Sequence, residues 1–145
     1  MSDWNSQINM EERFKAFWEM KALKYPLPFN GNNLERTLNV ISMAKEKGVE
    51  IRGKKILDIA CGTGIYTLPL AREAAHVTGL DSSDNMIKRL TDEAVKHGIT
   101  NLGIIKESWN KIDIEAMGLK KSFDIVWTSM SMAVKDREDF IRMEA

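Results

Sequence analysis

Residues 57–65 read Leu-Asp-Ile-Ala-Cys-Gly-Thr-Gly-Ile, and they decide the fold of this chain. An apolar strand at 55–59 carries the acid Asp58 and runs into a turn with two glycines, Gly62 and Gly64, that opens onto a helix. Glycine adopts backbone angles that other residues resist, and it lets a ligand lie against the main chain. The free N–H groups at the start of a helix suit an anionic or polar ligand. The pattern therefore predicts a nucleotide-type site where the first strand ends.

Strands and helices alternate from residue 54 onward. We expect strands at 55–59, 76–80, 102–105 and 123–128, and helices at 63–75, 83–97 and from 136 to 143. Strands that are separated by helices of this length pair in parallel through right-handed crossovers. The strands are apolar without alternation, as in a sheet whose two faces are both covered. The sequence thus predicts an α/β fold with a doubly wound, mainly parallel sheet.

An N-terminal helical segment precedes the sheet. Apolar residues recur at helical spacing in 10–21, two prolines make 25–29 extended, and a turn at 31–33 leads into a helix that ends at Gly48. We expect residues 1–53 to form a lid or cap and residues 54–145 to form the core, within a single domain.

The composition narrows the class of protein. A chain of 145 residues holds one domain with one core. Its 21 basic residues balance 21 acidic ones, which leaves no basic field to hold a polyanion. No apolar run suits a membrane span, the start lacks a signal-peptide pattern, and the one cysteine, Cys61, cannot by itself form a disulfide or a cysteine-based metal site. We therefore expect a cytoplasmic protein with a small-molecule substrate, without a metal and without nucleic-acid or membrane partners.

Three nucleotide-type ligands compete for the glycine turn. A phosphate-gripping P-loop needs Gly-Lys-Ser/Thr, but Ile65 follows Gly64. A dinucleotide site wants a third glycine where this chain has Thr67, which disfavours that alternative. S-adenosylmethionine has no pyrophosphate; it carries a sulfonium and an α-amino group, which the carboxylate of Asp58 suits. At the end of the next strand, Asp81 can accept both hydroxyls of a ribose.

With these features the chain resembles the class I S-adenosylmethionine-dependent methyltransferases. The resemblance rests on three stretches in the family's order, 56–64, 78–87 and 123–129, and it spans about residues 54–143. It implies a Rossmann-like methyltransferase core, with S-adenosylmethionine as cofactor and S-adenosylhomocysteine as product. The family's sheet has seven strands in the order 3-2-1-4-5-7-6, of which this sequence supplies the first four, so the chain looks truncated.

The resemblance also implies roles for individual residues. Asp58 and the backbone at Ala60, Gly62 and Gly64 would hold the methionine part of the cofactor, and Asp81 would hold its ribose. Ala60 stands where many members of the family have glycine. The other candidates are Ser82 and Met86 beside the adenine, Glu107, Ser108 and Trp109 at the adenine edge, Thr128 facing the methionine tail and the substrate, and Trp18, Lys21 and Tyr25 in an N-terminal lid.

Three functions remain open at this point. The first is an enzyme that transfers a methyl group from S-adenosylmethionine to a small-molecule nucleophile, with no catalytic residue assigned. The second is a catalytically incompetent fragment or module that binds S-adenosylmethionine. The third is a fragment of a dinucleotide oxidoreductase, which Thr67 disfavours. The outer edge of the fourth strand carries little charge, so we also expect a homodimer through that edge.

Overall fold

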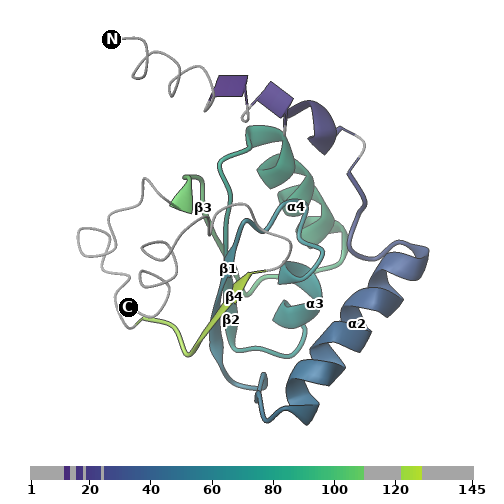
Figure 1. Ribbon diagram of the computed structural model, residues 1–145, viewed down its shortest axis with the longest axis vertical. Helices are drawn as coiled ribbons and strands as arrows, with labels where there is room; N and C mark the ends of the chain where they lie inside the picture. Colours follow the sequence, from purple (N-terminus) through teal and green to yellow (C-terminus); the bar gives the residue numbers. More distant parts are fainter. Residues whose placement is uncertain (1–11, 14–15, 18, 24, 110–121, 129–145) are drawn as a thin grey trace.

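Four parallel strands form the sheet of the computed structural model, which describes residues 12–13, 16–17, 19–23, 25–109 and 122–128. The strands are β1 (Lys55–Ile59), β2 (His76–Leu80), β3 (Leu102–Ile105) and β4 (Ile125–Thr128). They lie in the order β3-β2-β1-β4, and every adjacent pair is parallel (Figure 1). The structure confirms the predicted α/β fold and the strand order of the Rossmann-like core. The helix predicted at 136–143 lies outside the described residues.

The strands β1, β2 and β3 begin and end where the sequence predicts, whereas β4 begins at Ile125 rather than at residue 123. Asp124 explains the difference. Its carboxylate accepts a hydrogen bond from the N–H of Lys55 at 2.9 Å, and its own N–H donates to the Lys55 carbonyl at 2.8 Å. These two bonds use the backbone and side chain of Asp124 before the regular ladder of β4 begins.

Three helices lie wholly within the described residues: α2 (Gly31–Glu46), α3 (Thr67–Ala71) and α4 (Asp84–Lys96). The helix α4 matches its prediction, because the hydroxyl of Ser83 caps it by accepting from the N–H of Met86 at 3.2 Å. The turn predicted at 31–33 is wrong, since these residues already form the first turn of α2. None of the described helices is both long and apolar enough to cross a membrane.

The helix α3 is much shorter than the helix predicted over 63–75. Gly64 has a φ of +93°, which lies outside the right-handed helical region, so a regular helix can begin only after it. At the other end, the side-chain amide of Asn101 donates to the carbonyls of Ala71 at 2.7 Å and Ala74 at 3.1 Å. These bonds satisfy carbonyl groups where the helix stops, and the chain then turns into β2.

The three helices cover the same face of the sheet (Figure 1). On this face α2 and α3 pack over Ile56 of β1 and Val77 of β2. The helix α4 packs against α3 through Leu90 and Leu68, which share a cluster with Cys61. The opposite face is apolar as well, and its buried cluster consists of Leu57, Ile59, Leu80 and Trp109.

The carboxyl ends of the strands meet at one edge of the sheet, because all of the strands are parallel. Asp58 is the penultimate residue of β1, Asp81 directly follows β2, and Thr128 ends β4. In the register Ile59 lies between Leu80 and Thr128, so these strand ends are neighbours. Ligands of open α/β sheets bind at this edge.

Candidate functional site

The turn after β1 is built from residues with left-handed backbone. The angle φ is +59° at Ala60, +58° at Gly62 and +93° at Gly64. Within the described part of the chain, Ala60 alone among residues other than glycine has a positive φ, a conformation that costs about 1 kcal/mol. Ala60 therefore adopts the left-handed backbone of the turn despite this strain, at a position where many members of the family have glycine.

Gly64 faces the protein interior. A Cβ at this position would overlap Cδ1 of Leu90 on α4 and would lie 3.1 Å from Cγ of Leu68 on α3. The N–H of Gly64 donates to the carbonyl of Cys61 at 3.0 Å, so this donor is already used. Close packing of α4, rather than close approach of a ligand, is the structural reason for a glycine here.

Asp81 joins the two loops that frame the site. Its Oδ2 accepts from the N–H of Gly62 at 2.9 Å, and its Oδ1 accepts from the N–H of Ser83 at 2.9 Å. Burial raises the pKa of Asp81, hydrogen bonds from the backbone of Ser83, Gly62 and Ser82 lower it, and the charge of Glu19 raises it. The acid predicted to hold a ribose thus lies at the glycine turn.

Asp58 lies beneath the same turn and is only 3% exposed. Its Oδ2 accepts from the hydroxyl of Thr67 on α3 at 2.7 Å. The pKa of Asp58 is raised to about 7, because burial and the charge of Asp81 raise it by more than the hydrogen bond from Thr67 lowers it. A cation beside this carboxylate would favour its charged form. The two acids make a site suited to a cationic ligand with hydrogen-bond donors.

Thr67 is a site residue that the sequence reasoning missed. In the sequence Thr67 is noted only because it stands where a dinucleotide motif has its third glycine. In the structure its hydroxyl donates a hydrogen bond to the carboxylate of Asp58. A glycine could not supply this bond. The signal that could have found it is a hydroxyl at the start of the helix, nine residues after the acid of the strand.

Tyr25 lies over the glycine turn. A carbon of its ring is 3.7 Å from the place of a Cβ on Gly62. Burial raises the pKa of the Tyr25 phenol, and the charge of nearby Asp81 raises it further. Lys21 is exposed, and its ammonium lies 5.3 Å from the centre of the Phe17 ring. Trp18, the third residue predicted for the lid, lies outside the described residues.

Two side chains of the core hold the N-terminal segment in place. Arg89 of α4 donates to the carbonyl oxygens of Ala22 and Tyr25, the latter at 2.9 Å. The hydroxyl of Thr63, in the glycine turn, donates to the carbonyl of Pro26 at 2.6 Å. Figure 1 shows the purple N-terminal stretch alongside the start of α4. Neither Arg89 nor Thr63 is predicted as a site residue from the sequence.

The residues predicted near an adenine fall in different environments. Ser82 is half-buried, and Met86 is 2% exposed beneath the turn, its sulfur 3.8 Å from the place of a Cβ on Gly62. Glu107 and Ser108 are half-buried, and the N–H of Ser108 donates to the Glu107 carboxylate at 2.9 Å. Trp109 is 4% exposed within an apolar cluster. Met86 and Trp109 are therefore buried packing residues, Met86 below the glycine turn and Trp109 against Ile59 and Leu80 at the ends of β1 and β2.

Thr128 is placed beside β1 at the carboxyl edge, where its register partner is Ile59. Its hydroxyl is buried and has no hydrogen-bond partner within the described residues. Cys61 is buried among Leu68 and Leu90, and burial, followed by the charges of Asp58 and Asp81, raises its pKa well above the ordinary value. Cys61 is therefore a protonated thiol that fills space in the core.

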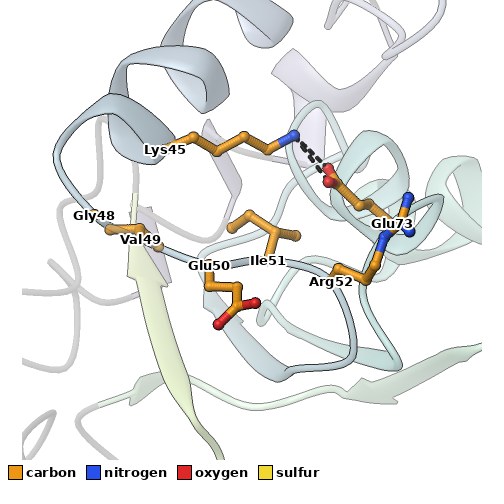
Figure 2. Close-up of a pocket in the computed structure, with 7 residues that line it drawn as sticks. All are labelled: Lys45, Gly48, Val49, Glu50, Ile51, Arg52 and Glu73. Carbon is orange, nitrogen blue, oxygen red and sulfur yellow. Dashed lines mark hydrogen bonds and ion pairs between the residues drawn. The ribbon is translucent and has the colours of Figure 1, made fainter.

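A surface hollow of about 300 Å³ lies away from these acids. Figure 2 shows its lining, which comes from the end of α2, the loop before β1 and the turn after α3. The ammonium of Lys45 is 2.6 Å from a carboxylate oxygen of Glu73 at its rim. Because the loop 48–52 leads into the start of β1, this hollow is at the opposite edge of the sheet from Asp58. It is not the candidate site.

A parallel sheet with acids at the carboxyl ends of β1 and β2, joined by a glycine turn, defines a Rossmann-like nucleotide-binding protein. Residues 56–143 match the sequence profile of the family described as "Methyltransferase domain". The chain belongs to this family. The resemblance to Rossmann-like methyltransferases that the sequence motifs indicate is thereby confirmed.

Curated relatives include 23S rRNA (uracil(1939)-C(5))-methyltransferases RlmD. The protein from Hahella chejuensis is 37% identical over 78 residues, which are 54% of this chain and 18% of that protein. The protein from Aeromonas hydrophila is 33% identical over 112 residues, which are 77% of this chain and 24% of that protein. This chain therefore spans about a quarter or less of the length of these relatives.

Solved structures share the fold. The phosphoethanolamine N-methyltransferase 1 of Haemonchus contortus superposes with a TM-score of 0.68 at 20% identity, over 92% of this chain and 28% of that chain. An S-adenosylmethionine-dependent methyltransferase from Aquifex aeolicus superposes with a TM-score of 0.57 at 21% identity, over 71% of this chain and 54% of that chain.

The relatives overturn the expectation of a small-molecule partner with nucleic acid excluded. Proteins named for 23S rRNA share the sequence of this domain, so a net charge of zero does not exclude nucleic acid. Net charge is a sum over the chain and does not report on local patches or on other parts of a longer protein. The homodimer expected through the edge of β4 stays a prediction.

Proposed function

We propose that this chain binds S-adenosylmethionine at the carboxyl ends of β1 and β2, as the donor for a methyltransferase reaction. The observation that carries the proposal is the pair of acids, Asp58 and Asp81, held on either side of a glycine turn. When bound, this cofactor supplies an electrophilic methyl group on a sulfonium. Its positive charge and ribose hydroxyls complement two acids, whereas a diphosphate would be repelled by them.

The residues of the site have distinct parts in this proposal. Asp81 accepts hydrogen bonds from the ribose hydroxyls, and Asp58 balances the positive charge of the methionine end. Thr67 keeps the Asp58 carboxylate in place through its 2.7 Å hydrogen bond. Tyr25 covers the glycine turn and excludes water from it. Their contribution is to bind and orient the donor, because a displacement gains rate from correct positioning of its reactants.

For the acceptor we infer an RNA base. The support comes from relatives of 31–37% identity that are named for methylation of a uracil in 23S rRNA. A cytoplasmic location stays a prediction alongside this inference.

Calorimetric titration with S-adenosylhomocysteine tests the donor site. We expect micromolar binding by the wild type and a loss of about tenfold or more in Asp81→Asn, since a hydrogen bond to a charged group is removed. Asp92→Asn, on an exposed position of α4, is the matched control and should bind as the wild type does. A wild type that binds no S-adenosylhomocysteine contradicts the proposal.

Transfer of tritium from the labelled methyl group of S-adenosylmethionine tests the acceptor. RNA transcribed in vitro carries no modified bases, so its uracils are all open to methylation. We expect label in the RNA that ribonuclease treatment releases. Binding of the cofactor without label in RNA would contradict the RNA inference, while the proposed donor site would stand.

A further inference from the structure

The N-terminal segment brings a third acid to the site. Glu19 lies next to the start of α4, where its Oε2 accepts from the N–H of Asn85 at 3.3 Å. The side-chain amide of Asn85 donates in return to the carbonyl of Glu19 at 3.1 Å. Together with the bonds from Arg89 and Thr63, this pair docks the segment on the core. The position of Glu19 is therefore fixed at both its backbone and its side chain.

One oxygen of this carboxylate is left over. Oε1 of Glu19 is buried and has no hydrogen-bond partner within the described residues. A buried acceptor without a donor is unfavourable, and such groups in proteins usually meet a water molecule or a ligand. Capping of α4 does not require it, because the hydroxyl of Ser83 already caps that helix. The free oxygen therefore points to a donor beyond the described residues, such as a bound ligand.

The surroundings of Glu19 indicate which donor that is. The charge of Glu19 raises the pKa of Asp81, the acid at the end of β2, and also the pKa of Lys106 after β3. Both acids accept from backbone N–H groups at the start of α4, Asp81 from Ser83 and Glu19 from Asn85. Their like charges repel, and a group with hydrogen-bond donors beside both acids relieves the repulsion. A ribose carries two neighbouring hydroxyls, and one of them can donate to a second acid beside Asp81.

We propose that Glu19 is a binding residue that accepts a hydrogen bond from a ribose hydroxyl of the cofactor, beside Asp81. This inference rests on the proposed function, because it takes the ligand to be S-adenosylmethionine or its product. The N-terminal segment is then part of the ribose site itself, and the core without it holds the ribose through Asp81 alone.

Titrations with S-adenosylhomocysteine and its 2′-deoxy and 3′-deoxy forms test this assignment. Glu19→Gln keeps an amide oxygen for the N–H of Asn85 but replaces the second acceptor with a donor. We expect it to bind S-adenosylhomocysteine about tenfold more weakly than the wild type. With one of the two deoxy forms the variant and the wild type should bind equally, because the donor is gone. Glu12→Gln, an exposed acid of the same N-terminal stretch, should bind all three as the wild type does.

A purely structural role of Glu19 gives a different pattern. Asn85→Ala removes the side-chain bond to the Glu19 carbonyl and leaves the carboxylate, so it should weaken all three ligands by the same factor. If Glu19→Gln follows that pattern, or leaves binding unchanged, the assignment is overturned while the proposed function stands. If the wild type binds none of the three ligands, both are overturned.

Discussion

Gly64 and Gly53 both have a positive φ but lie in different surroundings. A Cβ on Gly64 would overlap Leu90, whereas a Cβ on Gly53 would have no atom within 4 Å. Gly53→Ala should therefore cost only the backbone strain, about 1 kcal/mol of the free energy of unfolding. Gly64→Ala adds overpacking and should cost about 3 kcal/mol in total. Urea unfolding measures both, and equal losses would show that α4 does not press on Gly64.

Asp58 contributes to the pH dependence of the free energy of unfolding. Its pKa rises from 3.8 to about 7 in the folded chain, so between these values the folded state holds more protons than the unfolded state. Stability therefore falls as the pH rises from about 4 to about 7, and it levels off above that window. The raised pKa of Asp81 acts in the same direction. A wild-type stability that increases with pH over this window would contradict the assignment.

The isosteric variant Asp58→Asn separates the two acids. Its amide oxygen can still accept from Thr67, but it carries no charge to desolvate. We expect most of the pH slope to vanish and the free energy of unfolding at pH 8 to increase by roughly 2–4 kcal/mol. The same variant should bind S-adenosylmethionine more weakly, because it lacks the negative charge that balances the positive methionine end. Such a trade of stability for binding is common at functional sites. Thermal unfolding from pH 5 to 8, together with titration at pH 7.5, measures both effects.

At the scale of elements, the sequence predicts what local signals specify. The bounds of β1, β2 and β3 follow from short apolar runs between turns, and the start of α4 follows from Ser83, whose hydroxyl forms the cap bond. The length of α3 does not follow from local signals. It depends on the left-handed φ of Gly64 and on Asn101, which lies thirty residues after Ala71. A helical pattern in the sequence carries neither of these constraints.

Some residues of the candidate site are likewise predicted by local motifs, and others are not. Asp58, Gly62 and Asp81 stand at strand ends and in the glycine turn, so their motif predicts that they meet. Arg89 and Glu19 act across 67 and 66 residues of chain, through contacts with backbone carbonyl and amide groups that no motif encodes. Their roles become visible only when the N-terminal segment is placed on α4.

Arg89 should control how firmly that segment is docked. Its guanidinium donates to the carbonyls of Ala22 and Tyr25, which end the helical stretch and begin the extended one. In Arg89→Ala we expect faster amide hydrogen exchange across residues 19–30, with exchange in β1 and β2 unchanged. Lys88→Ala, the exposed neighbour, is the matched control. Unchanged exchange in 19–30 would mean that Thr63 and Asn85 hold the segment without Arg89.

At the scale of the whole molecule, charge alone is a poor guide to the acceptor. The chain balances 21 basic and 21 acidic residues, and three of the acids, Glu19, Asp58 and Asp81, lie at the candidate site. These acids suit the donor and say nothing of the acceptor. The RNA base that we propose as acceptor would therefore be held by local groups or by other parts of a longer protein, since this chain spans about a quarter or less of the length of the relatives.

Ligand binding at the candidate site should raise the stability of the whole chain. A ligand that binds only the folded state raises the free energy of unfolding by about 2.7 kcal/mol at a hundred times its Kd. For a chain of 145 residues this shifts the midpoint of thermal unfolding by roughly 8 °C. Calorimetry with S-adenosylhomocysteine should show this shift in the wild type and in Asp92→Asn, and a much smaller one in Asp81→Asn at the same ligand concentration. An equal shift in Asp81→Asn would mean that the ligand is held elsewhere than between the ends of β1 and β2.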